Sequence, residues 1–184
     1  MSPDLPGPAH PRIHVVAQAA VRWWWLWAVL AMATGAITVS AAGTFNIVAL
    51  ELAGTLERAN DAVAGTDPDT IRSAIFWDFV FVFFYALALC TGSLWTRRQL
   101  RSGFGSRVGV PIAIGAAIAG MLDIVENLSM LGYLNSWTEW SGWIPLAGAM
   151  AIPKFVLVFA SIAYVLAGIG TWAFRWLAHH RRGR

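Results

Sequence analysis

The sequence predicts an all-α membrane protein, a bundle of four transmembrane helices with both termini in the cytoplasm. Three observations support this. Of the 184 residues, 58% are hydrophobic and only 12% are charged, whereas about a quarter of the residues in a soluble domain are charged. Four apolar runs each exceed the roughly 20 residues needed to cross a bilayer. The charged residues between these runs change sign from one connection to the next.

The apolar runs define one transmembrane domain over residues 23–176. A disordered or interfacial cytoplasmic tail is expected before it, at residues 1–22, and a basic cytoplasmic tail after it, at residues 177–184. The four spans are expected at about residues 23–50, 71–95, 108–134 and 143–174. Pro153 should break the last of these, because proline cannot donate a backbone hydrogen bond inside a helix.

The connection between the first two spans carries helix start signals. Thr55 is a suitable N-cap for a short helix over residues 56–63. Asp67 followed by Pro68 is typical of an N-cap and the first helical position, so the next helix should begin there.

The basic residues determine the orientation. Arginines lie before the first span, between the second and third spans, and after the fourth, while the other two connections carry mainly acids. The positive-inside rule therefore places both termini in the cytoplasm. Tryptophans gather at the same levels, at the cytoplasmic interface (Trp23, Trp24, Trp25, Trp27, Trp95, Trp172, Trp176) and at the outer interface (Trp137, Trp140, Trp143).

Ionisable side chains inside these apolar runs mark the candidate site, because each costs roughly 2.5–3.5 kcal/mol at the centre of a bilayer. With a rise of about 1.5 Å per residue, Asp78 in the second span and Lys154 in the fourth should lie at similar depths in the outer half. Asp123, Glu126 and Asn127 follow one another at i, i+3 and i+4 and should share one face of the third span. We therefore expect the polar groups of three spans to converge.

Three further residues complete the candidate site. Tyr85 lies seven residues after Asp78 and should be its neighbour one level deeper. Asn46 and Glu51, near the outer end of the first span, should close the ring from above. Small residues such as Ala113, Ala117 and Gly120 continue the polar face of the third span. Such residues let a neighbouring helix approach closely, and they leave a homo-oligomer open as an alternative.

The charges of this site do not balance. Three carboxyls (Asp78, Asp123 and Glu126) face one ammonium, that of Lys154, so either some carboxyls stay protonated or a ligand supplies positive charge. The sequence favours a site for a proton, a small cation or an amphiphilic molecule, with Glu126 the first acid to titrate. Two alternatives stay open: a purely structural polar cluster in an accessory or assembly subunit, and a membrane-embedded acid/base enzyme acting on a lipid or isoprenoid.

Several other classes of function lack support in the sequence. All four histidines lie near the chain ends, and Cys90 is the only cysteine, so neither haem nor zinc is expected within the spans. No cofactor and no resident metal are predicted. The basic residues flank apolar segments instead of forming one patch, which argues against nucleic acid as a partner. The expected partner is the lipid bilayer.

Three segments carry a resemblance to known proteins: NIVALELAGTLERANDAV at residues 46–63, FWDFVFVFFYALAL at 76–89 and LDIVENL at 122–128. Together they cover most of residues 45–134, and the chain resembles a type of small bacterial inner-membrane protein with four spans. The resemblance implies the membrane location and the number of spans, and it implies no catalytic activity.

Overall fold

The computed structural model describes residues 18–100, 103–135 and 141–182. This part of the chain contains helices and no strands. Four of the helices are long and apolar enough to cross a membrane. They are α2 (Trp24–Ala42), α5 (Pro68–Leu100), α6 (Phe104–Leu134) and α7 (Trp143–Arg182). The proline-rich stretch at residues 1–11 and the outer tryptophans Trp137 and Trp140 lie outside the described residues.

The first apolar run does not form one span, and the expected boundary of residues 23–50 is wrong. Helix α2 ends at Ala42, and Gly43 adopts a φ of 59°, a left-handed conformation that glycine tolerates without strain. The chain then forms a separate helix, α3 (Ile47–Glu51). The Asn46 side chain starts α3 by accepting a hydrogen bond of 3.2 Å from the backbone N–H of Ala49. Residues that the sequence places at the top of a span therefore lie on a short helix that turns back.

The start signals in the following connection are confirmed. Helix α4 (Leu56–Val63) begins after Thr55, whose hydroxyl accepts a hydrogen bond from the backbone N–H of Arg58. Helix α5 begins at Pro68, and Asp67 Oδ2 accepts from the N–H of Thr70 at 3.1 Å. Each cap occupies a donor that the first helical turn would otherwise leave free.

The expected break at Pro153 is wrong, because α7 continues through it from Trp143 to Arg182. Helix α6 likewise continues through Pro111. A proline removes one hydrogen bond from a helix, and packing against neighbouring helices can hold the remaining turns in line. Lys154, next to Pro153, therefore projects from a continuous helix.

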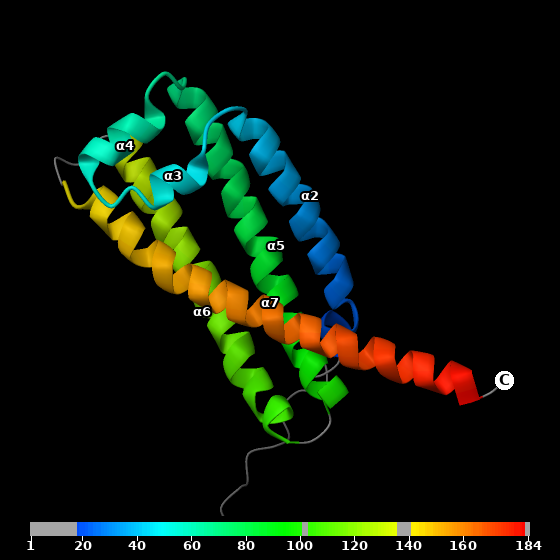
Figure 1. Ribbon diagram of the computed structural model, residues 1–184. Coiled ribbons are helices and arrows are strands. Elements are labelled where there is room, and N and C mark those ends of the chain that lie inside the picture. Colours follow the sequence, from blue (N-terminus) through cyan, green and yellow to red (C-terminus); the bar gives the residue numbers. More distant parts are fainter. Residues whose placement is uncertain (1–17, 101–102, 136–140, 183–184) are drawn as a thin grey trace, which may run out of the picture.

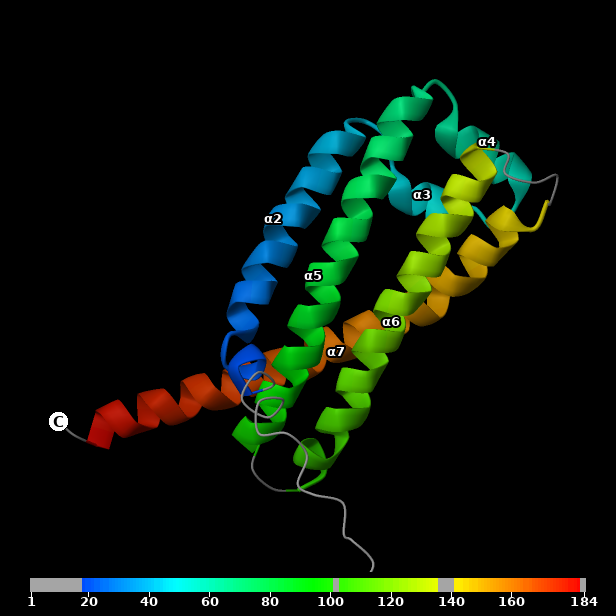
Figure 2. The ribbon, with the colours of Figure 1, turned by 180° about the vertical axis from the view of Figure 1, so that it is seen from behind.

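The long helices pack in sequence order, with α2 on α5, α5 on α6 and α6 on α7. Helices α2, α5 and α6 run side by side, and α7 crosses them at an angle until its C-terminal part projects beyond the bundle (Figures 1 and 2). Small residues permit the close approaches: a Cβ at Gly120 would lie 2.9 Å from Ala86 Cβ, and one at Gly168 would lie 2.2 Å from Thr96 Oγ1. Of the small face expected on α6, Ala113 and Gly120 are buried, whereas Ala117 is exposed.

The short helices α3 and α4 close one end of the bundle (Figure 1). A compact apolar core lies beneath them, and five of its members are at most 1% exposed: Leu50, Ile71, Ile75, Met130 and Ile144. Because Leu50 lies in this core, the neighbouring Glu51 is also drawn inward and is only 4% exposed. The core of this end therefore places an acidic side chain of α3 among the long helices.

Candidate functional site

Lys154 of α7 lies at the centre of a buried ionic cluster. Its ammonium Nζ is 2.8 Å from Glu126 Oε2, 3.2 Å from Asp123 Oδ1 and 3.2 Å from Glu51 Oε2. The Lys154 side chain is 4% exposed, and none of the three acidic side chains exceeds 7%. One ammonium therefore joins three carboxyls that come from α6 and α3.

Two hydrogen bonds extend this cluster to α5. The hydroxyl of Tyr85 donates to Asp123 Oδ2 at 2.7 Å, and the amide Nδ2 of Asn127 donates to Asp78 Oδ2 at 2.7 Å. We refer to these seven residues as the polar cluster: Glu51, Asp78, Tyr85, Asp123, Glu126, Asn127 and Lys154. Its members come from α3, α5, α6 and α7, which explains why sequence spacing alone relates only some of them.

The two residues expected to close the ring behave differently. Glu51 joins the cluster directly, through its ion pair with Lys154. Asn46 does not join it: its side chain is exposed, and it caps α3 instead. The difference arises because α3 is a separate helix, so that its last residue points into the bundle while its N-cap stays at the surface. Glu51 lies outside the four candidate spans, and burial raises the pKa of its carboxyl, an effect that the charge of Lys154 opposes.

Asp78 differs from the other acids of the cluster. Among the residues that the structure describes, its one polar partner is the neutral amide of Asn127, and no Lys, Arg or His forms an ion pair with it. Asp78 is nevertheless buried, with only 7% of its surface exposed. A buried carboxylate without a cationic partner is costly, so Asp78 is the acid that a positive ligand would stabilise most.

Two atoms at the back of the cluster have no hydrogen-bond partner in the described structure. They are Glu126 Oε1 and Asn127 Oδ1, and both side chains have 0% exposure. Most buried polar atoms are satisfied, so such exceptions mark a site where a proton, water or ligand is needed.

A cavity of about 620 Å³ adjoins the cluster between α2, α5 and α7. Its polar wall is formed by five members of the polar cluster, Glu51, Asp78, Tyr85, Asp123 and Lys154. Most of the remaining wall is apolar and includes Ala31, Gly35 and Met32 of α2, Phe81 of α5, and Phe155, Val158 and Phe159 of α7. We call this cavity the lateral groove. Glu126 and Asn127 do not line it and lie behind the residues that do.

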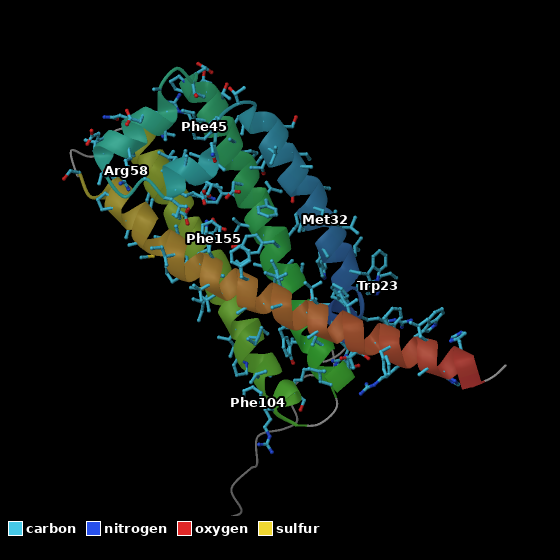
Figure 3. The ribbon with its side chains drawn as sticks, viewed as in Figure 1. Trp23, Met32, Phe45, Arg58, Phe104 and Phe155 are labelled. Atoms are coloured by element: carbon cyan, nitrogen blue, oxygen red, sulfur yellow. The ribbon has the colours of Figure 1, made fainter. Side chains whose placement is uncertain are left out.

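The mouth of the lateral groove is on the side of the bundle. Met32, Val39 and Phe159 line the groove, yet they are 68%, 71% and 64% exposed, so they form its outer rim. Figure 3 shows Met32 on α2 and Phe155 on α7, with α5 running between these helices. At the inner end, Lys154 Nζ lies 4.6 Å from the centre of the Phe155 ring, where the aromatic wall meets the charged one.

Three acids of the cluster approach one another closely enough to share a metal ion. Glu51, Asp123 and Glu126 each offer a carboxylate oxygen within 4.8 Å of the others. The same three acids, however, converge on Lys154 Nζ. An ammonium in this position supplies the positive charge that a cation would bring, so the arrangement favours Lys154 as their counter-ion.

The sequence analysis identified the ionisable members of the site and missed the lateral groove. Its α2 wall carries small or flexible residues at helical spacing: Ala28, Ala31, Met32, Gly35 and Thr38. That spacing is visible in the sequence and could have indicated a face of α2 turned toward the cluster. The α7 wall had no such signal, because it depends on the angle at which α7 crosses the bundle.

No protein-family model, no curated protein and no solved structure matches this chain.

Proposed function

We propose that this protein is a multi-pass membrane protein that binds a cationic amphiphile, with the hydrocarbon tail in the lateral groove and the positive head group at Asp78. In this proposal α2, α5, α6 and α7 span a bacterial inner membrane with both termini in the cytoplasm. The observation that carries the proposal is the junction of an apolar groove of about 620 Å³ with a buried carboxylate that has no cationic partner.

The position of the groove mouth supports entry from the lipid. When α2 and α7 lie in a bilayer, the exposed rim residues Met32, Val39 and Phe159 face hydrocarbon. An amphiphile can then slide in sideways, and its tail exchanges one apolar environment for another. The gain in free energy must therefore come from the head group, which is where the groove becomes charged.

The charge of the cluster selects the sign of that head group. Four carboxyls (Glu51, Asp78, Asp123 and Glu126) face one ammonium. An anionic head group would add to this imbalance, whereas a cationic one reduces it. Among the options that the sequence analysis left open, the groove favours an amphiphile over a bare cation, because a bare cation needs no long apolar channel.

Photolabelling tests this proposal at the level of the site. The full chain is reconstituted in phosphatidylcholine nanodiscs and irradiated with a long-chain alkylamine that carries a diazirine in its tail. We expect the label on groove residues of α2 and α7, with hexadecyltrimethylammonium as a competitor and hexadecyl sulfate without effect. Labelling spread evenly over lipid-facing positions, and insensitive to both competitors, would overturn the proposal.

A matched pair of variants on α7 sharpens the test. Val158→Trp places an indole in the lateral groove, because Val158 lines it. Val156→Trp introduces the same side chain two residues earlier, at a position that is 63% exposed and does not line the groove. Labelling should fall strongly in the first variant and persist in the second.

A structural role for the cluster is the second candidate, and the way Lys154 ties α3 and α6 to α7 favours it. If that role is the whole function, Asp78→Asn leaves labelling unchanged.

The acid/base enzyme also stays an alternative, because the same carboxyls and groove could act on a lipid or isoprenoid. It predicts that a lipid-like molecule co-purifies in chemically altered form, which native mass spectrometry can detect.

A further inference from the structure

The back of the polar cluster carries a feature that amphiphile binding at Asp78 does not use. Glu126 faces Lys154 with Oε2 at 2.8 Å, but its other oxygen, Oε1, is fully buried and has no hydrogen-bond partner in the described structure. Glu126 does not line the lateral groove. A ligand in the groove therefore has no direct contact with this carboxyl.

Glu51 and Asp123 are the two acids that connect Glu126 to the groove, and of these Glu51 is the one on α3. Glu51 and Glu126 share Lys154 as an ion-pair partner and offer carboxylate oxygens within 4.8 Å of each other. Two carboxylates that lie this close in a buried site oppose each other's ionisation, so the pair is a place where a proton can be held. Unlike Glu126, Glu51 lies on α3, outside the four candidate spans, so a proton on this pair is next to one end of the bundle.

We infer that the Glu51–Glu126 pair holds a proton while the groove is empty and releases it when a cationic head group binds at Asp78. This inference rests on the proposed function and assigns to it a second activity, the exchange of one proton for one cation.

The exchange balances in charge and in atoms. Binding brings one positive charge into the cluster; the O–H bond of the Glu126 carboxyl breaks, and its proton passes by way of Glu51 to bulk water. The net charge of the buried cluster is the same before and after. Without this release, the new cation would lie near the ammonium of Lys154 with one acid of the cluster neutralised, which weakens its binding.

The other groups around the pair are accounted for element by element. Helix α5 contributes Asp78 and Tyr85, α6 contributes Asp123, and α7 contributes Lys154. Helix α2 has no ionisable residue between Trp24 and Ala42. The charged residues of α4, which are Glu57, Arg58 and Asp61, are all exposed. Asp78, Tyr85 and Lys154 are the other groups that could lose a proton. The three acidic neighbours of Lys154 hold its proton in place, and proton release that persists in the Glu51 and Glu126 variants described below would identify Asp78 or Tyr85 as the donor.

Proton release measured alongside binding tests the inference. The probe is hexadecyltrimethylammonium, whose quaternary nitrogen carries no proton, so any proton that appears comes from the protein. It is added to the full chain in weakly buffered phosphatidylcholine nanodiscs that contain a pH indicator, with empty nanodiscs as the blank. We expect about one proton per bound cation, and an apparent Kd that falls by up to about tenfold for each unit increase in pH.

Glu126→Gln identifies the source of the proton, because the amide imitates a carboxyl that never gives its proton up. This variant should release no proton from the pair, and its Kd should change less with pH than that of the unaltered protein. Glu51→Gln should give the same result, and it replaces Glu126→Gln as the test variant if Glu126→Gln does not fold. Glu57→Gln, an exposed acid of α4, is the matched control and should behave as the unaltered protein.

The outcomes separate the two proposals. Binding by the unaltered protein without proton release overturns the exchange and leaves amphiphile binding intact. Full proton release in Glu126→Gln and Glu51→Gln also overturns it, and points to Asp78 or Tyr85 as the donor. Absence of probe binding overturns the proposed function, and the exchange with it.

Discussion

Asn127 Nδ2 donates a 2.7 Å hydrogen bond to Asp78 Oδ2, so a residue with 0% exposure holds the carboxylate that faces the lateral groove. Asn127→Leu removes this donor and leaves Asp78 without a polar partner among the described residues. We expect a loss of about 1–3 kcal/mol in stability, the usual cost of an unsatisfied buried polar group. Thermal unfolding in detergent measures it. Gln18→Leu, at an exposed amide side chain, is the control, and equal shifts for the two variants would contradict the prediction.

The carboxylate of Asp78 is expected to dominate binding of the cationic probe. Asp78→Asn keeps the shape of the side chain and removes its charge. Hydrogen bonds and ion pairs to a charged group contribute about 1.5–3 kcal/mol, so affinity for hexadecyltrimethylammonium should fall by tenfold or more. Isothermal titration in nanodiscs gives the Kd. Asp69→Asn removes an acid at the exposed start of α5 and should leave the Kd unchanged.

Lys154 should be essential for folding at neutral pH. Lys154→Met leaves Glu51, Asp123 and Glu126 without their shared cation, and breaking a buried pair in this way costs about 3–5 kcal/mol. Size-exclusion chromatography should show little folded protein at pH 7.5. The yield should recover as the pH is lowered, because protonated carboxyls need no counter-ion. Adding Glu51→Gln and Glu126→Gln to Lys154→Met should restore folding at pH 7.5, and failure at every pH would argue against the charge explanation.

The turn after α3 places Glu51 through a close glycine contact. A Cβ at Gly148 of α7 would lie 3.2 Å from Gly54 Cα, and Gly54 itself has a φ of 65°. Gly148→Val should therefore push this turn away and draw Glu51 from Lys154, at a cost of about 1–3 kcal/mol. We expect lower thermal stability together with weaker dependence of probe binding on pH. Gly170→Val is the matched change on the same helix, where a Cβ meets nothing within 4 Å.

The proposed orientation can be tested by cysteine labelling. In a Cys90→Ser background, Glu57→Cys lies on α4 at one end of the bundle and His179→Cys lies near the end of α7. A membrane-impermeant maleimide added to intact spheroplasts should label Glu57→Cys at once and His179→Cys after permeabilisation. The reverse order would place both termini outside. Simultaneous labelling would mean that the two positions are on the same side, so that an odd number of spans does not separate them.

The polar cluster shows which relationships could be read from the order of residues. Asp123, Glu126 and Asn127 were grouped correctly, because helical spacing alone puts i, i+3 and i+4 on one face. Asp78 and Lys154 were expected at the same depth, because the rise of a helix converts sequence position into depth. The ion pairs themselves, such as that of Lys154 with Glu51, depend on how the helices are rotated about their axes.

Glu51 and Asn46 mark the limit of the sequence-based prediction. Both are expected near the outer end of a span over about residues 23–50, because a run of apolar residues looks the same whether or not the helix stops. The helix ends at Ala42, where Gly43 permits a turn that returns the chain to the bundle. Glu51 therefore pairs with Lys154, whereas Asn46 is an exposed helix cap.

That this chain forms long apolar helices, several of them with ionisable groups, can be predicted from the order of its residues. Both properties follow from composition and from the 3.6-residue period of the helix, which are local. That an apolar groove ends at Asp78 and that Glu126 lies behind it becomes visible in the packed bundle alone. These facts depend on the angle at which α7 crosses its neighbours and on the turn at Gly43. Helix crossing is set by side-chain packing between segments far apart in the chain, which no local pattern encodes.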